Sequence, residues 1–133
     1  MKFQKGYTLV EIMVVVVILG ILASLIIPRI VSRPEEARIV KAKQDVHAIE
    51  SALELYKLDN GFYPSNEQGL DALVHEPTTD PKPLHWHEGG YLKKIPVDPW
   101  GKPYQYANPG THDDDVDVFT VSPKQQEIGN WMD

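Results

Sequence analysis

The pattern of hydrophobic residues divides the chain into two unequal parts. Residues 7–27 form a run of 21 positions in which almost every side chain is apolar. As a helix rising about 1.5 Å per residue, this run would measure about 31 Å, close to the roughly 30 Å hydrocarbon core of a bilayer. Because it is apolar on all sides, the run predicts a membrane-spanning helix.

Beyond residue 32 the pattern becomes one-sided. Apolar residues recur there at spacings of three and four, at Ile39, Ala42, Val46, Ile49, Leu53 and Tyr56. This spacing predicts an amphipathic helix with one face on a globular core. The opposite face carries Lys41, Gln44, Asp45 and Lys57.

A proline stands between the two parts. Pro28 has no backbone N–H and leaves the carbonyl of Ser24 without its helical donor, so we expect a kink or local unwinding there. Residues 32–35 (Ser-Arg-Pro-Glu) fit a capping box, from which a helix would restart or be reinforced.

The remaining chain predicts short elements joined by turns. Residues 65–68 (Ser-Asn-Glu-Gln) form a second capping box, which predicts a short helix to about His75. Residues 104–106 and 116–121 are the strand candidates, and Val116, Val118 and Thr120 share one face of the second. The fold class predicted is α+β, a long N-terminal helix packed on a small antiparallel sheet.

One carboxylate interrupts the apolar run. Glu11 would lie within the bilayer, where an unpaired charge costs several kcal/mol, so it is a candidate functional residue. Lys2 and Lys5 precede the run and indicate a cytoplasmic N-terminus. The run lacks the small-x-small site at which a secretory signal peptide is cleaved.

Composition excludes several function classes. The 133 residues include no cysteine, which rules out disulfides and zinc-thiolate sites. The net charge of −6 argues against nucleic-acid binding. No nucleophile-elbow, zinc-protease or phosphate-loop motif is present, so we expect no enzyme. His85 and His87 form an H-x-H pair without a third ligand, which is typical of a surface loop.

The start of the chain resembles a known processing signal. Residues 5–11 (Lys-Gly-Tyr-Thr-Leu-Val-Glu) are similar to the class III signal of type IV pilins and type II secretion pseudopilins. The resemblance implies cleavage after Gly6 by a prepilin peptidase, which also methylates the new N-terminus at Tyr7. It also implies that Glu11 neutralises this amine on a neighbouring subunit. The alternative is a tolerated glutamate that reaches outward to the interface.

The resemblance extends over nearly the whole chain and is specific to the major pseudopilins of type II secretion. The matching motifs are residues 56–60, 63–64, 67–70, 89–92, 98–101, 104–106 and 128–131. The resemblance implies a leader (residues 1–6), a membrane and filament-core helix (7–31) and a periplasmic domain (32–133). Adhesive type IV pilins often close their C-terminal region with a disulfide, which this chain cannot form.

The implied function is that of major structural subunit of the pseudopilus. Such a subunit forms a homopolymer that grows from the inner membrane into the periplasm, with minor pseudopilins and an inner-membrane assembly platform as partners. It helps export folded proteins across the outer membrane. The alternatives are a type IV pilin or minor pseudopilin, and, in a different class, a signal-anchored periplasmic binding domain that needs neither cleavage at Gly6 nor Glu11.

Three charged residues match family positions that are proposed to pair between protomers. These are Glu50 and Glu54 on the amphipathic helix and Lys93 after the Gly-Gly-Tyr motif. The alternative is that all three only keep the subunit soluble, because exposed ion pairs contribute little, about 0–1 kcal/mol.

The chain departs from the family at the loop that usually binds calcium. Here that loop, residues 122–127, is short and has Glu127 as its one carboxylate, whereas calcium takes about 6–8 oxygen ligands. The other weak candidate ligand is Asp117, which lies in an acidic cluster with Asp113, Asp114 and Asp115. The alternative, which we favour, is that this cluster is a solvated acidic turn leading into a strand. We expect no cofactor and a loop stabilised by packing around Trp131.

Overall fold

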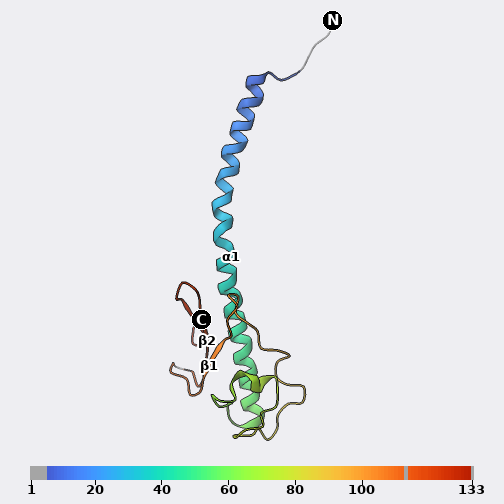
Figure 1. The fold of residues 1–133 in the computed structure, drawn as a ribbon, viewed down its shortest axis with the longest axis vertical. Coiled ribbons are helices and arrows are strands. Elements are labelled where there is room, and N and C mark those ends of the chain that lie inside the picture. The colour runs from blue at the N-terminus through green and yellow to red at the C-terminus, as the bar shows by residue number, and fades with distance from the viewer. Residues whose placement is uncertain (1–5, 113, 133) are drawn as a thin grey trace. The chain divides into compact units, whose positions relative to one another are not determined.

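The computed structural model describes residues 6–112 and 114–132; the side chains of residues 25–33 are outside the description. The elements are helix α1 (Leu9–Asn60), the 3-10 helix η1 (Gly69–Leu73) and strands β1 (Gln105–Ala107), β2 (Asp117–Val121) and β3 (Glu127–Gly129) (Figure 1). The predicted α+β class is confirmed. The chain separates into two compact units, Met1–Ala37 and Arg38–Asp133, each described by itself.

The first unit contains the beginning of α1. Thr8 caps the helix, because its hydroxyl accepts a hydrogen bond from the Glu11 amide (3.1 Å) and its carbonyl one from the Ile12 amide (3.2 Å). Within the described residues, no helix combines the length and the apolar character needed to cross a membrane.

The backbone of α1 is helical through residues 28 and 32. Local unwinding at Pro28 and a helix restart at residue 32, each one of two expected outcomes, are therefore wrong; reinforcement of the helix at residues 32–35 stays a prediction. A proline removes only one hydrogen bond of the ladder, and the turns on either side remain helical, so the helix continues. The kink, the other outcome expected at Pro28, stays a prediction.

The second unit is built on the one-sided part of α1. Val46, Ile49, Leu53 and Tyr56 are at most 1% exposed, which confirms the predicted apolar stripe. Their core partners include Leu73 beyond α1 and Val118 on β2. Asp45, predicted on the solvated face, is instead half-buried, since it accepts a hydrogen bond from the Tyr104 hydroxyl at 2.7 Å.

The three strands form one antiparallel sheet in the order β1-β2-β3. The register pairs Tyr106 with Val118 and Thr120 with Ile128. Val118 and Thr120 are fully buried, as their alternation predicted, and the outward Phe119 is half-buried. The third strand was not predicted; Glu127–Gly129 contains a single apolar side chain, Ile128, and shows no alternating pattern.

The capping box at residues 65–68 is confirmed. The Ser65 amide donates to Gln68 Oε1 (3.0 Å), and the Gln68 amide donates to Ser65 Oγ (3.1 Å). The helix that follows is shorter than predicted and is a 3-10 helix rather than an α-helix. Gly69 has a φ of 62°, a left-handed conformation that stops an α-helix from continuing directly out of the box.

Asp98 ties the loop before β1 to the central strand. Its Oδ1 accepts hydrogen bonds from the amides of Trp100 (3.0 Å) and Lys102 (2.7 Å), and its Oδ2 accepts one from the Thr120 hydroxyl. The side chain is buried, so these three donors replace the water that the carboxylate would otherwise bind.

We expect Asp98→Ala to lower the free energy of unfolding by about 2–4 kcal/mol, because buried donors are left without an acceptor. Thermal unfolding of the purified chain measures this. Asp71→Ala is the control, since Asp71 is an exposed aspartate on η1, and it should change stability by less than about 0.5 kcal/mol. Equal losses in the two variants would show that the Asp98 network does not stabilise the domain.

Candidate assembly surface

The segment before α1 is accessible. Gly6 and Tyr7 lie outside any regular element, and Tyr7 is 75% exposed. In the subunit alone, every described side chain of residues 7–24 is exposed. The large apolar side chains of this segment therefore have no cover within the described part of the subunit.

Glu11 lies in the first turn of α1 and is exposed. A carboxylate at this end of a helix interacts favourably with the unpaired backbone N–H groups. Among the described residues, no cationic side chain forms an ion pair with it. The cap at Thr8 was missed in the sequence, although Thr-x-x-Glu at residues 8–11 is the pattern that could have revealed it.

Two of the three predicted pairing residues line one small acidic pocket. Glu50 and Glu54 lie there with Asp114 and Asp115, around a volume of about 100 Å³. The remaining lining residues are Tyr63, Val116 and Asn130. The contribution of the two aspartates was not predicted. Lys93 is exposed but is not part of this pocket, so the structure does not bring it together with the glutamates within one subunit.

The pocket has a negative electrostatic character. Burial raises the pKa of the Tyr63 hydroxyl, and the nearby charges of Asp115, Glu54, Glu50 and Asp114 raise it further. Lys57 offsets part of this charge: its Nζ lies 3.5 Å from Asp115 Oδ2 and 4.8 Å from the centre of the Tyr63 ring. Four carboxylates around one lysine leave an excess of negative charge.

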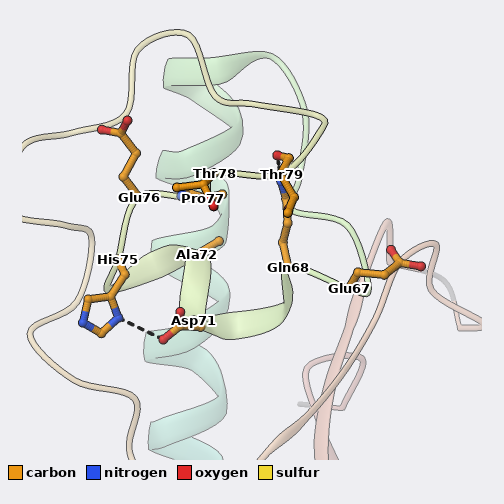
Figure 2. Close-up of a pocket in the computed structure, with 9 residues that line it drawn as sticks. All are labelled: Glu67, Gln68, Asp71, Ala72, His75, Glu76, Pro77, Thr78 and Thr79. Atoms are coloured by element: carbon orange, nitrogen blue, oxygen red, sulfur yellow. Dashed lines mark hydrogen bonds and ion pairs between the residues drawn. The ribbon is translucent and has the colours of Figure 1, made fainter.

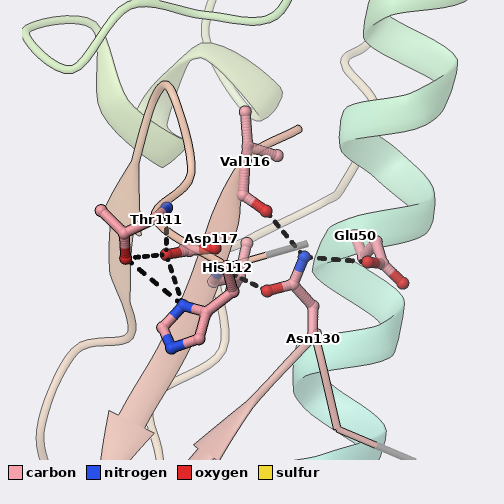
Figure 3. A network of polar contacts seen from close by, with 7 residues as sticks. Glu50, Thr111, His112, Val116, Asp117 and Asn130 are labelled. Carbon is pink, nitrogen blue, oxygen red and sulfur yellow. Dashed lines mark hydrogen bonds and ion pairs between the residues drawn. The ribbon is translucent and has the colours of Figure 1, made fainter. Parts of the chain in front are cut away.

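The Glu50 carboxylate is fixed by the C-terminal segment (Figure 3). Asn130 Nδ2 donates to Glu50 Oε2 at 2.9 Å and to the Val116 carbonyl at 2.8 Å, while Asn130 Oδ1 accepts from the Val118 amide at 2.9 Å. The exposed His47 lies close to the same carboxylate, with its Nδ1 3.7 Å from Glu50 Oε1. One amide side chain thus joins α1 to β2.

A second cluster surrounds Asp117 at the start of β2 (Figure 3). Its Oδ2 accepts hydrogen bonds from the Thr111 amide (2.9 Å) and the Thr111 hydroxyl (3.0 Å) and lies 2.9 Å from His112 Nδ1. Burial by itself would raise the pKa of Asp117, but the hydrogen bonds from Thr111 and His112 outweigh it, so the pKa is lowered. On its other side, the imidazole of His112 stacks on the indole of Trp131.

The predicted solvated acidic turn is therefore wrong for Asp117, which is buried. Its side chain turns inward because Thr111 and His112 supply donors there. Asp115 is exposed and Asp114 half-buried, whereas Asp113 lies outside the described residues.

The loop at residues 122–127 is held by its own hydrogen bonds. Ser122 is buried; its carbonyl accepts from the Gln125 amide (2.8 Å) and its hydroxyl from the Gln126 amide (3.1 Å). Trp131 contacts the rings of His112 and Phe119, at ring-centre distances of 3.5 and 5.7 Å. Hydrogen bonds thus stabilise the loop, and its packing around Trp131 stays a prediction.

A polar pocket beside η1 shows no arrangement suited to catalysis (Figure 2). It measures about 220 Å³ and is lined by residues 67–68, 71–72 and 75–79. Gln68 Nε2 closes one wall by donating to the carbonyls of Thr79 (2.7 Å) and Pro81 (3.0 Å). His75 pairs with Asp71 at 3.0 Å, while Glu67 and Glu76 point to different sides (Figure 2).

The His85–His87 pair is tied into the fold through its backbone. The His85 amide donates to Asn60 Oδ1 (2.8 Å) and the His87 amide to the Tyr91 hydroxyl (3.2 Å). Within residues 6–112 and 114–132, no three histidine or acidic side chains are grouped as a metal site would need.

Comparisons with known proteins agree with the motifs along the chain. Residues 29–133 match the family model described as "Type II secretion system (T2SS), protein G", and residues 1–27 match the "Prokaryotic N-terminal methylation motif". The type II secretion system core protein G of Pseudomonas aeruginosa is 54% identical over 96% of this chain and 95% of that protein. Its namesake from Vibrio cholerae is 50% identical over 98% and 94%.

The fold agrees as well. The crystal structure of the major pseudopilin from the type 2 secretion system of enterohaemorrhagic Escherichia coli superimposes with a TM-score of 0.69 at 42% identity, covering 75% of this chain and 87% of that one. With an accessible N-terminal segment, an apolar helix and a closed domain built on its continuation, the chain belongs to the type II secretion system protein G family, the major pseudopilins.

Proposed function

We propose that this chain is the major structural subunit of the type II secretion pseudopilus, a homopolymer that grows from the inner membrane and helps export folded proteins across the outer membrane. The observation that carries this proposal is the uncovered apolar surface of α1, which bears Glu11 near its start. A surface of this kind needs lipid or other subunits around it. The family resemblance over nearly the whole chain supports the filament.

Processing comes first in this proposal. A prepilin peptidase cleaves between Gly6 and Tyr7 and methylates the Tyr7 amine, leaving residues 7–31 as the membrane and filament-core helix and residues 32–133 as the periplasmic domain. The methylation motif over residues 1–27 and the exposure of the segment support this step. The N-terminus lies in the cytoplasm before assembly.

Glu11 then sets the register of the polymer. Its carboxylate pairs with the methylated amine of Tyr7 on a neighbouring subunit, because two opposite charges are tolerated in an apolar core only when they meet. A subunit displaced along the axis would leave both charges unpaired. The absence of a cationic partner for Glu11 among the described residues of its own subunit supports this role.

The globular domains add a second set of contacts. The pocket with Glu50 and Glu54 receives Lys93 of a neighbouring copy, and Asp114 and Asp115 strengthen the attraction. The excess negative charge of the pocket and the exposure of Lys93 support this pairing. Each pair is weak alone, about 0–1 kcal/mol, but it repeats at every subunit of the filament.

The partners of the chain follow from the same proposal. They are further copies of itself, minor pseudopilins, the inner-membrane assembly platform and the prepilin peptidase. A type IV pilin or a minor pseudopilin would share the N-terminal processing but would not form homopolymers of this secretion system. A signal-anchored periplasmic binding domain would keep residues 1–6.

Intact-mass analysis of the chain extracted from membranes tests the processing. We expect a mass that lacks residues 1–6 and carries one added methyl group. A Gly6→Ala variant serves as the comparison and should keep the leader. A wild-type chain that retains Met-Lys-Phe-Gln-Lys-Gly, or is cut elsewhere, would exclude the pseudopilin mechanism.

Substitution of Glu11 tests the register. We expect Glu11→Ala to reduce filaments recovered by sedimentation after overexpression at least about tenfold, because the Tyr7 amine loses its partner in the apolar core. Glu127→Ala removes an exposed carboxylate from the C-terminal loop and should leave filament yield unchanged. Filaments of normal yield from Glu11→Ala would contradict the role of this residue.

Charge reversal tests the contact between domains. Glu54 is the cleaner target, since Glu50 is also bonded to Asn130. We expect Glu54→Lys and Lys93→Glu each to weaken assembly about three- to fivefold, and the double variant to recover most of the loss. Glu67→Lys, a reversal on the exposed surface beyond α1, is the control. Additive losses in the double variant would argue against the pairing.

A further inference from the structure

The resemblance to major pseudopilins implies calcium in the loop before the closing Gly-Asn-Trp, but the oxygen atoms of this chain do not fit the ion. Calcium takes about 6–8 oxygen ligands at 2.3–2.6 Å. The loop offers the single carboxylate of Glu127, which is exposed, and both oxygens of Ser122 already accept backbone hydrogen bonds within the turn.

Asp117 is equally unsuited as a ligand. Its Oδ2 already contacts the amide and hydroxyl of Thr111 and the imidazole of His112. Its Oδ1 has no hydrogen-bond partner among the described residues and lies close to Gly110, where a Cβ atom would meet it at 2.7 Å. Among the described residues, no three histidine or acidic side chains are grouped around this oxygen as a metal site would need.

We infer that closure of the C-terminal segment in this pseudopilin is independent of metal and is performed by His112. The imidazole bridges two parts of the domain. Its Nδ1 lies 2.9 Å from Asp117 Oδ2, and its ring lies flat on the indole of Trp131, with centroids 3.5 Å apart and planes inclined by 1°. Asp117 begins the central strand β2, and Trp131 follows β3.

The position of Trp131 depends on Gly129. A Cβ atom at Gly129 would collide with the Trp131 ring, so the indole lies directly over the end of β3. Phe119 on β2 borders the same ring at 5.7 Å. The indole is therefore enclosed by β2, β3 and His112, and removing the imidazole opens one side of this enclosure.

The stack of His112 on Trp131, together with the contact of His112 with Asp117, is called the clamp below. The residue between Gly129 and Trp131 connects this clamp to helix α1. Asn130 is 7% exposed and makes three side-chain hydrogen bonds, to Val116, Val118 and Glu50. Its amide also donates to the Val118 carbonyl at 3.0 Å. Holding Trp131 thus holds Asn130, which in turn holds the central strand against α1.

Metal dependence is tested on the purified, processed full chain in detergent. We expect its Tm to differ by less than about 1 °C between an excess of calcium and an excess of the chelator EGTA, since the chain presents no calcium site. A calcium-dependent rise of about 4 °C or more would overturn the inference, because it would correspond to a bound ion that stabilises the fold.

The clamp is tested by His112→Ala against His75→Ala. Each histidine lies about 3 Å from an aspartate, but Asp71 is exposed whereas Asp117 is buried, and of the two only His112 stacks on an indole. We expect His112→Ala to lower the Tm by about 4 °C or more and His75→Ala by less than about 1 °C. Amide hydrogen exchange should accelerate at Val118 and Asn130 at least about tenfold more than at Leu53 within α1.

A conservative variant separates the stack from the hydrogen bond. His112→Asn keeps a donor for Asp117 but lacks the aromatic face, and we expect it to show the same local acceleration of exchange at Asn130 as His112→Ala. It also serves as the test if His112→Ala does not fold. A loss of Tm no larger than that of His75→Ala, or exchange that rises uniformly across the domain, would overturn the clamp.

Discussion

The globular domain depends on the packing of one face of α1 against the central strand β2. Ile49, Leu53 and Tyr56 of α1 are fully buried in the same core as Val118 of β2. Each buried side chain of this size contributes about 1.5–3 kcal/mol relative to exposure. Everything outside this contact, including the loops that carry the acidic pocket, is positioned by elements that rest on it.

Polar side chains fix the position of α1 and of the loop before β1 relative to β2. Asp98 joins the loop before β1 to Thr120, Asn130 joins β2 to Glu50, and Asp45 accepts a hydrogen bond from Tyr104. Apolar packing is tolerant of small shifts, whereas hydrogen bonds at 2.5–2.9 Å are not. The same bonds immobilise Glu50, so that stability of the domain and the geometry of its acidic pocket have common causes.

The sequence predicts the features that depend on periodicity or on local motifs. The apolar stripe, the capping box at residues 65–68 and the inward face of residues 116–120 were all confirmed, because each arises from residues close in the chain. Features formed between distant segments were missed or misassigned. The contact of Asn130 with Glu50 joins residues 80 positions apart. Asp117 looked solvated because no sequence pattern marks Thr111 and His112, six and five positions before it, as its donors. The local unwinding expected at Pro28 was wrong because the single hydrogen bond that proline removes does not interrupt the helical turns on either side.

Gly129 and Trp131 illustrate how two positions become a single constraint on sequence change. Since the indole occupies the volume in which any side chain at position 129 would begin, a larger residue there requires a smaller ring at position 131. The stack with His112 would be lost with that ring. We therefore expect residues 112, 129 and 131 to be substituted only together. A substitution at one of the three positions alone would disturb the packing of the indole between β2, β3 and His112.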